Sequence, residues 1–238
     1  MGLKHNKTCD NINQGQDNNV FGGHGMLLEK ERSLIVEFGK LLLARRLVAG
    51  TSGNLSVYDR SSGHVAISPS GLDYESTQPG DVVVVDMSGA VVDGCRRPSS
   101  ELAMHMGLYE KRPDVCAVVH THSVFATTLA CLEYSLPAVH YMIGFAGKEV
   151  RCAPYATFGT RELAESACAE IGDAQAVLLS HHGLLACGAD LAGAFNVAEQ
   201  VEYCAEIYWR ARAIGSPAVI PDREMDTIIE KFGDYGRR

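Results

Sequence analysis

The stretch over residues 98–122 constrains this chain more than any other, because it places a carboxylate and two imidazoles close together in the sequence. The apolar run over residues 115–119 predicts a buried β-strand, and it leads into His120-Thr-His122. Side chains two residues apart on a strand point to the same face, so both imidazoles can reach one metal ion. Such a pair is weak evidence by itself, and we expect a third ligand from a distant part of the chain.

A second apolar run, residues 176–179, ends in two histidines, His181 and His182, followed by a glycine. We expect the third ligand here, and the pattern leaves open which histidine supplies it. Three neutral imidazoles with one open position are typical of a catalytic zinc site, whereas a structural site is closed by four protein ligands and is usually rich in cysteine.

An anion-binding cradle is predicted beside these ligands. A helix is expected to begin after Pro98, with Ser99 as its N-cap, so its free N–H groups and the hydroxyls of Ser99 and Ser100 can hold a phosphate. Two turns of small residues, 50–54 (GTSGN) and 68–71 (SPSG), end neighbouring segments and could close round the same anion. Plain turns and an ordinary capped helix remain the simpler interpretation of each signal alone.

Composition limits the possible partners. The chain has 238 residues, 46% of them hydrophobic, and one domain over residues 26–238 can bury a sizeable core. The net charge of −8 and the lack of a basic block argue against nucleic acid and anionic membranes. Eight scattered cysteines and no signal-like or membrane-spanning run predict a cytoplasmic protein. Residues 1–25, rich in Asn and Gln, are expected to form a disordered arm or extension.

Periodicity predicts strands interrupted by helices, with hairpin signals in place of a strict β-α-β alternation. This pattern favours a mostly antiparallel sheet covered by helices on both faces. Helices are expected over residues 26–50, 99–111, 123–129, 160–171, 190–214 and 222–232. Strands are expected over residues 55–58, 64–67, 81–86, 91–92, 115–120, 136–143 and 176–179.

Seven motifs, taken together, resemble the class II aldolase/adducin family, and within it most closely the L-fuculose-phosphate aldolases. They follow one another in order between about residues 26 and 238. The motifs are residues 50–54 (GTSGN), 68–71 (SPSG), 98–101 (PSSE), 120–122 (HTH), 140–143 (HYMI), 152–163 (CAPYATFGTREL) and 181–183 (HHG).

The resemblance implies an α/β fold, a three-layer α/β/α sandwich with a central, mostly antiparallel sheet. It also implies a homotetramer with active sites shared between subunits, and a bound Zn²⁺, with Mn²⁺ or Co²⁺ as alternatives. Carried over position by position, it makes His120, His122 and His182 the metal ligands.

The same resemblance assigns Glu101 as the acid/base and Tyr141 as a catalytic residue lent to a neighbouring subunit. It places Phe158 and Tyr235 on the aldehyde side of the substrate. The residues implied to bind phosphate are Thr51, Gly53, Asn54, Ser70, Gly71, Ser99 and Ser100.

The implied activity is the reversible cleavage of a ketose 1-phosphate, of the L-fuculose 1-phosphate kind, to dihydroxyacetone phosphate and a small aldehyde such as lactaldehyde. An aldolase acting on 5-deoxyribulose or 5-methylthioribulose 1-phosphate is an open alternative. So are a pentulose-phosphate 4-epimerase, a methylthioribulose-phosphate dehydratase and a non-catalytic adducin-like module. The presence of all three histidines and Glu101 argues against the non-catalytic module.

Overall fold

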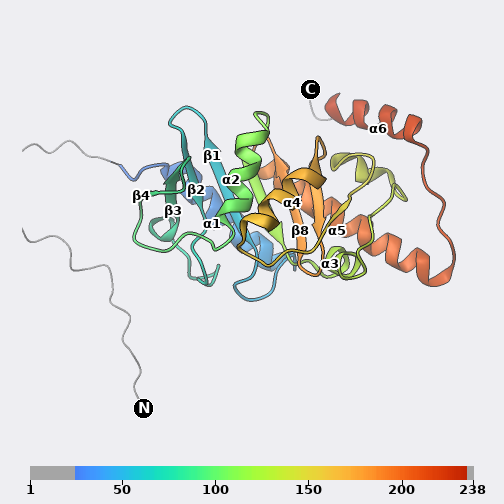
Figure 1. Ribbon diagram of the computed structural model, residues 1–238, viewed down its shortest axis with the longest axis horizontal. Coiled ribbons are helices and arrows are strands. Elements are labelled where there is room, and N and C mark those ends of the chain that lie inside the picture. The colour runs from blue at the N-terminus through green and yellow to red at the C-terminus, as the bar shows by residue number, and fades with distance from the viewer. Residues whose placement is uncertain (1–24, 235–238) are drawn as a thin grey trace, which may run out of the picture.

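An eight-stranded sheet forms the centre of the protein, which the computed structural model describes over residues 25–234 (Figure 1). The strand order is β4-β3-β2-β1-β5-β8-β7-β6, and among the described strands only β6 and β7 pair in parallel, so the predicted mostly antiparallel sheet is confirmed. The strands are β1 (Asn54–Asp59), β2 (His64–Ile67), β3 (Val83–Asp86), β4 (Val91–Asp93), β5 (Ala117–Thr121), β6 (Cys152–Ala153), β7 (Ala176–Leu179) and β8 (Gly183–Gly188).

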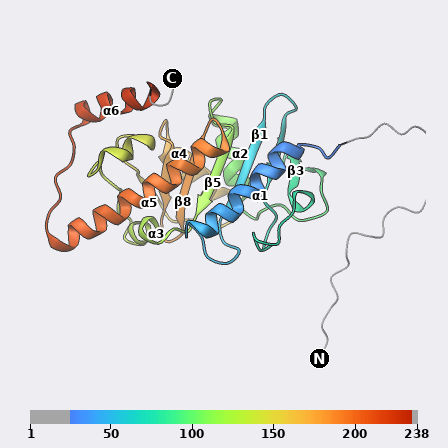
Figure 2. The same ribbon diagram turned by 180° about the vertical axis from the view of Figure 1, so that it is seen from behind.

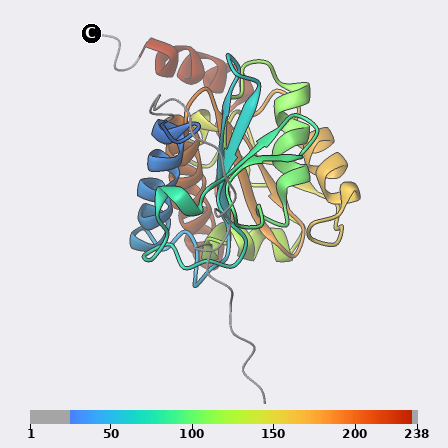
Figure 3. The ribbon, with the colours of Figure 1, turned by 90° about the vertical axis from the view of Figure 1, so that its left-hand side faces the viewer.

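Helices cover both faces of this sheet. Figure 2 shows α1 (Glu29–Ala44) and α5 (Leu191–Ile214) crossing one face, and Figure 3 shows α2 (Leu102–Lys111) and α4 (Arg161–Ile171) on the other. The remaining elements are α3 (Val124–Cys131), α6 (Asp222–Asp234) and the short 3₁₀ helices η1 (Pro79–Asp81) and η2 (Tyr141–Phe145). The predicted three-layer α/β/α sandwich is therefore confirmed.

The central strand β5 shows why the sheet needs both helical layers. Ala117 and Val119 pack into the apolar cluster under α1 and α5, whereas Val118 packs into the cluster under α2 and α4. All five residues of β5 are buried, which explains the nearly continuous apolar run that precedes the histidine pair. The active-site candidates thus lie at the end of a strand that is held on both faces.

Two predicted elements differ from the structure. The helix expected from Ser99 begins at Leu102 instead, with Glu101 at its N-cap position. Ser99 still caps the turn that leads into it, because its Oγ accepts a 3.2 Å hydrogen bond from the Glu101 backbone N–H and its carbonyl accepts one from the Leu102 N–H. The strand expected over residues 136–143 does not form: Leu136 makes one isolated bridge to Val150, Pro137 interrupts the pairing, and η2 follows.

The other long helices agree with their sequence signals. Thr160 caps α4 by accepting a hydrogen bond from the Leu163 backbone, and Asp190 caps α5 in the same way through the Gly193 backbone. Among the described residues, no helix combines the length and apolar composition needed to span a membrane. The arm predicted for residues 1–25 lies, except for its last residue, outside the described part of the chain.

Candidate active site

Three histidines from two separate segments of the chain meet at one edge of the sheet. His120 is the fourth residue of β5 and His122 follows that strand, while His182 lies in the turn between β7 and β8. Their ring centroids are 4.7–5.0 Å apart, and His120 Nε2 is 2.9 Å from His122 Nε2. The ligand atoms of all three rings lie within 4.8 Å of one another, so His182 and not His181 completes the predicted cluster.

The three imidazoles are suited to hold a divalent cation. His120 is fully buried, and its Nδ1 lies 2.9 Å from the Leu184 carbonyl, which fixes the proton on Nδ1 and leaves the Nε2 lone pair directed at the cluster. Burial is the largest cause that lowers the pKa of His120, His122 and His182, so the rings stay neutral, as metal ligands must be. The donor set therefore fits the expected ion.

The glycine of the histidine turn permits this approach. A Cβ atom on Gly183 would overlap the backbone carbonyl oxygen of Thr121 and lie 3.1 Å from the His122 ring. Only glycine allows β8 to come this close to the end of β5, and that contact sets His182 beside His122. The same turn places His181 in a left-handed backbone conformation with its ring outside the cluster, 6.0 Å from the Tyr155 ring.

The Glu101 carboxylate faces the same space from the start of α2. Its Oε2 lies 3.2 Å from His120 Nε2 and accepts a 2.8 Å hydrogen bond from Asn54 Nδ2. Its Oε1 lies 3.2 Å from His182 Nε2 and, although buried, accepts no hydrogen bond from any described residue. A buried carboxylate oxygen without a donor, 3.2 Å from an imidazole nitrogen of the cluster, is a further sign that this space suits a cation.

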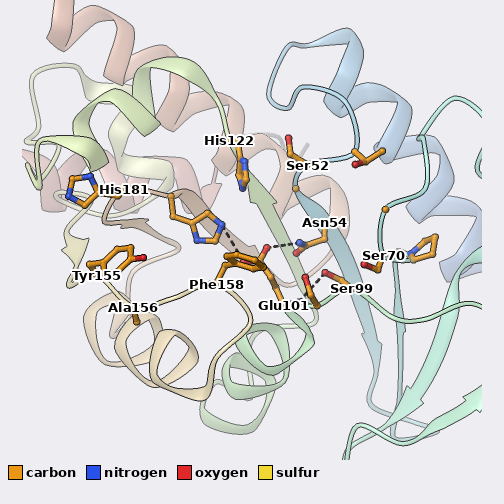
Figure 4. Close-up of a pocket in the computed structure, with 16 residues that line it drawn as sticks. Ser52, Asn54, Ser70, Ser99, Glu101, His122, Tyr155, Ala156, Phe158 and His181 are labelled. Atoms are coloured by element: carbon orange, nitrogen blue, oxygen red, sulfur yellow. Dashed lines mark hydrogen bonds and ion pairs between the residues drawn. The ribbon is translucent and has the colours of Figure 1, made fainter.

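A pocket of about 380 Å³ opens over this cluster (Figure 4). All seven residues predicted to bind phosphate line it, together with Glu101, His122, His182 and Phe158. The two serine-bearing loops meet through an isolated antiparallel bridge between Pro69 and Pro98, which brings Ser70 next to Ser99. The predicted convergence of the small-residue turns is therefore confirmed as geometry, and Ser99 lies two residues before the N-cap position of α2.

The turn over residues 50–54 packs closely against β5, the strand that carries His120. Gly53 has φ +74°, and a Cβ there would lie 2.7 Å from the His120 carbonyl oxygen. The Tyr74 hydroxyl donates a 2.8 Å hydrogen bond to the Gly53 carbonyl from the other side. Through this contact and the β1–β5 pairing, in which Asn54 lies opposite His120, the turn is held at a fixed place beside the histidines.

Sequence reasoning missed several lining residues. They are Ser52, Pro69, Tyr155, Ala156 and His181. Each adjoins a predicted residue or lies within a motif, so the motif boundaries were the available signal. Tyr155 and Phe158 are exposed aromatic residues on one connection that lines the pocket, and Figure 4 shows Tyr155 on the His181 side.

One predicted residue, Tyr141, does not line this pocket, and another, Tyr235, is not among the described residues. Tyr141 lies on η2, is 49% exposed and contacts the rings of His140 and Phe232. Its placement is therefore outside the pocket of its own chain. Tyr235 follows α6 and lies outside the described residues.

Comparison with known proteins gives a consistent result. The family model described as class II aldolase and adducin N-terminal domain matches residues 33–209. A 5-deoxy-D-ribulose 1-phosphate aldolase of Bacillus thuringiensis is 51% identical over 90% of this chain and 100% of its own length. A 5-methylthioribulose-1-phosphate/5-deoxyribulose-1-phosphate aldolase of Rhodospirillum rubrum is 43% identical over 85% of this chain and 90% of its own. A solved L-fuculose 1-phosphate aldolase superposes with a TM-score of 0.86 at 48% identity, covering 89% of this chain and all of that one.

Proposed function

Because this chain belongs to the class II aldolase and adducin family, we propose that it reversibly cleaves a ketose 1-phosphate to dihydroxyacetone phosphate and a small aldehyde. The observation that carries this proposal is a pocket lined by a carboxylate with one free oxygen and a small-residue cradle, which opens over a cluster of three neutral imidazoles. A non-catalytic module does not need that combination of groups. The two relatives above, which match this chain over 90% or more of their own length, are named aldolases.

In this proposal His120, His122 and His182 hold Zn²⁺ or another divalent ion such as Mn²⁺ or Co²⁺. When bound, such an ion supplies Lewis-acid polarisation of a substrate carbonyl. No Schiff-base lysine is needed, and the lining of this pocket includes none. Lys148 does not line the pocket; its Nζ forms an ion pair with Asp226 on α6 at 2.7 Å.

The remaining steps fall to the protein's own side chains. Glu101 moves the proton at the carbon next to the carbonyl, using the oxygen that accepts no hydrogen bond. The hydroxyls of Ser70, Ser99 and Ser100 and the backbone amides of the 51–54 turn bind the phosphate and fix one half of the substrate. Tyr141 of a neighbouring subunit exchanges a proton with the hydroxyl oxygen that becomes the aldehyde.

The aldehyde end meets an apolar wall. Phe158 is 67% exposed at the pocket edge, with Ala156 beside it. A methyl or other small apolar tail covers such a ring at less desolvation cost than a charged group would. We therefore favour 5-deoxyribulose 1-phosphate and L-fuculose 1-phosphate as substrates, with the 5-methylthio analogue as a further candidate, in line with the names of the relatives.

Incubation of the purified enzyme with a panel of sugar phosphates tests this proposal. We expect the 1-phosphates with a short apolar tail to release dihydroxyacetone phosphate. Substrates with a charged aldehyde end should react poorly. Because an apolar pocket discriminates one methylene or hydroxyl by only about 10–200-fold, several of them should be turned over.

Identification of the products distinguishes the alternatives. Faster conversion of ribulose 5-phosphate than of every 1-phosphate, without carbon–carbon cleavage, would favour a 4-epimerase. Loss of water from methylthioribulose 1-phosphate with no aldehyde released would favour a dehydratase.

The exposed position of Tyr141 supports an active site shared within a homo-oligomer, a homotetramer in our proposal. Mixing Glu101→Gln subunits with Tyr141→Phe subunits should restore activity that neither variant has alone, because some sites then combine an intact Glu101 with an intact Tyr141. Turnover after subunit exchange is the measurement. In the control, Tyr141→Phe is mixed with the double variant, which cannot form an intact pair; equal recovery in both mixtures, or none in either, contradicts a shared site.

A further inference from the structure

A line of buried polar side chains runs from the pocket into the core beneath α2. It begins at Glu101 and continues through Asn54, His105 and Ser56 to Tyr109, and each of these residues is at most 6% exposed. The successive contacts are 2.8 Å from Asn54 Nδ2 to Glu101 Oε2, 2.5 Å from His105 Nε2 to Asn54 Oδ1, 2.6 Å from Ser56 Oγ to His105 Nδ1 and 2.5 Å from Tyr109 Oη to Ser56 Oγ. So many polar groups among apolar neighbours are costly unless every one is paired.

The direction of every hydrogen bond in this line follows from its first member. An ionised Glu101 only accepts, so the Asn54 amide nitrogen faces it and donates, and the Asn54 carbonyl oxygen faces away. That oxygen only accepts, so His105 must carry its proton on Nε2. In a neutral ring Nδ1 then accepts from the Ser56 hydroxyl, which in turn accepts from Tyr109.

His105 can maintain this pattern because its ring stays neutral. It is fully buried, and that burial lowers its pKa to about 3. Its two hydrogen-bond partners, Asn54 and Ser56, are themselves uncharged. A single tautomer with the proton on Nε2 is therefore the only form that satisfies both neighbours.

The consequence for Glu101 is an asymmetric carboxylate. One oxygen is held by Asn54, and the other, Oε1, accepts no hydrogen bond from the described residues and faces His182. If the Asn54 amide were rotated by half a turn, its oxygen would face the Glu101 oxygen, and the carboxylate would be pushed from its place. The Nε2–H of His105 is what opposes that rotation, since it pairs only with the Asn54 oxygen.

We propose that His105 is a positioning residue for the reaction: it orients the Asn54 amide, which holds one oxygen of Glu101 and leaves the other free to transfer the proton. The proposal rests on the proposed function, in which Glu101 is the acid/base. It also gives Asn54 a role apart from the phosphate cradle to which its sequence position assigned it.

The tautomer of His105 is tested without turnover. Nitrogen NMR of the metal-loaded enzyme labelled with ¹⁵N-histidine should show one ring with a protonated Nε2 and a bare Nδ1 that does not titrate over the pH range in which the enzyme is stable. The signal is assigned by its loss in His105→Gln. A proton on Nδ1, or a titrating ring, overturns the proposed orientation even if the enzyme is an aldolase.

Kinetics test the consequence of that orientation. For His105→Phe we expect kcat to fall roughly 10- to 100-fold, the scale of effect that a small misplacement of a catalytic group has. KM should stay within a few-fold, because the proposed phosphate ligands are the hydroxyls of Ser70, Ser99 and Ser100 and the backbone amides of the 51–54 turn, and the substitution changes only the Asn54 side-chain amide. His105→Gln, which can still donate a hydrogen bond toward Asn54, should recover part of the loss, and Ser56→Ala should show a smaller fall in kcat.

Leu108→Val is the matched control for stability, because Leu108 is a fully buried residue of the same helix and lies outside the polar line. It should lower Tm with kcat unchanged. If His105→Phe lowers Tm but keeps kcat, or raises KM alone, the positioning role is wrong and the line serves stability or phosphate binding. If His105→Phe does not fold, His105→Gln and Ser56→Ala decide between the same outcomes. An absence of aldol cleavage by the wild-type enzyme would instead count against the proposed function and leave the NMR result standing.

Discussion

Replacing His122 with alanine should abolish activity and reduce the bound metal from one ion per subunit to a small fraction. His122 supplies one of the three imidazoles that converge at the site among the residues that the structure describes. Structural zinc sites bind with about 10–16 kcal/mol, so each of four ligands contributes roughly 3 kcal/mol, and losing one weakens binding by a factor of about 100 or more. Metal content measured by elemental analysis, beside aldol cleavage, checks this expectation.

His181→Ala is the control for the metal-ligand substitution. His181 adjoins His182 in the sequence, but its ring lies beside Tyr155 outside the three-ring cluster, so the variant should keep its metal. Full activity after exhaustive chelation, or unchanged metal content in His122→Ala, would contradict the assignment. When Zn²⁺, Mn²⁺ or Co²⁺ is added back to the chelated wild-type enzyme, activity should return only in samples in which the ion is bound.

The metal-ligand part of this site could be predicted from sequence because each of its motifs spans only a few neighbouring residues. Side chains alternate along a strand, which puts His120 and His122 on one face. The histidines and glycine that follow the apolar run 176–179 indicate where the third ligand lies. Which histidine of that turn points inward was not contained in periodicity; the close approach of Gly183 to Thr121 decides it. That contact joins residues 62 positions apart, beyond the reach of any local rule.

The sequence signals failed where tertiary contacts override local preference. A proline followed by two serines is a good helix start, yet residues 99–102 form a separate turn closed by the Leu102 N–H and the Ser99 carbonyl, so α2 begins at Leu102. The apolar residues 136–143 have strand composition, but Pro137 and the single bridge at Leu136 stop the pairing. Strand β8 was not predicted either, because its sequence begins with the glycine of the histidine turn.

The buried line behind Glu101 was equally out of reach. Asn54 and Glu101 are 47 residues apart, and His105 appears in the sequence only as one more polar position on an apolar helix. The pairing of β1 with β5 and the packing of α2 on the sheet bring them together. The role of His105 on α2 depends on its contact with Asn54 on β1, so it can be inferred only from the packing of the helix on the sheet.

Replacing Glu101 with glutamine should preserve the fold and the metal but remove most of the turnover. Glutamine has the shape of glutamate and can still accept the Asn54 hydrogen bond through its oxygen, so the surroundings of the carboxylate stay in place. It cannot take up a proton, and positioned acid/base groups typically contribute about 10²–10⁴-fold in rate. We therefore expect kcat to fall by that factor, with unchanged Tm, metal content and phosphate binding.

Glu110→Gln makes the same chemical change on the same helix, at an exposed position far along α2, and should leave kcat and KM unaltered. Ser100→Ala, in contrast, should act mainly on KM, because Ser100 lines the cradle and not the face where Glu101 meets His182. Turnover of Glu101→Gln within a few-fold of wild type would mean that another group moves the proton. Among the described residues of the pocket, the other titratable side chains are the metal-ligand histidines, His181 and Tyr155. A histidine whose lone pair binds the ion cannot also accept a proton. His181 and Tyr155 are then the next residues to substitute.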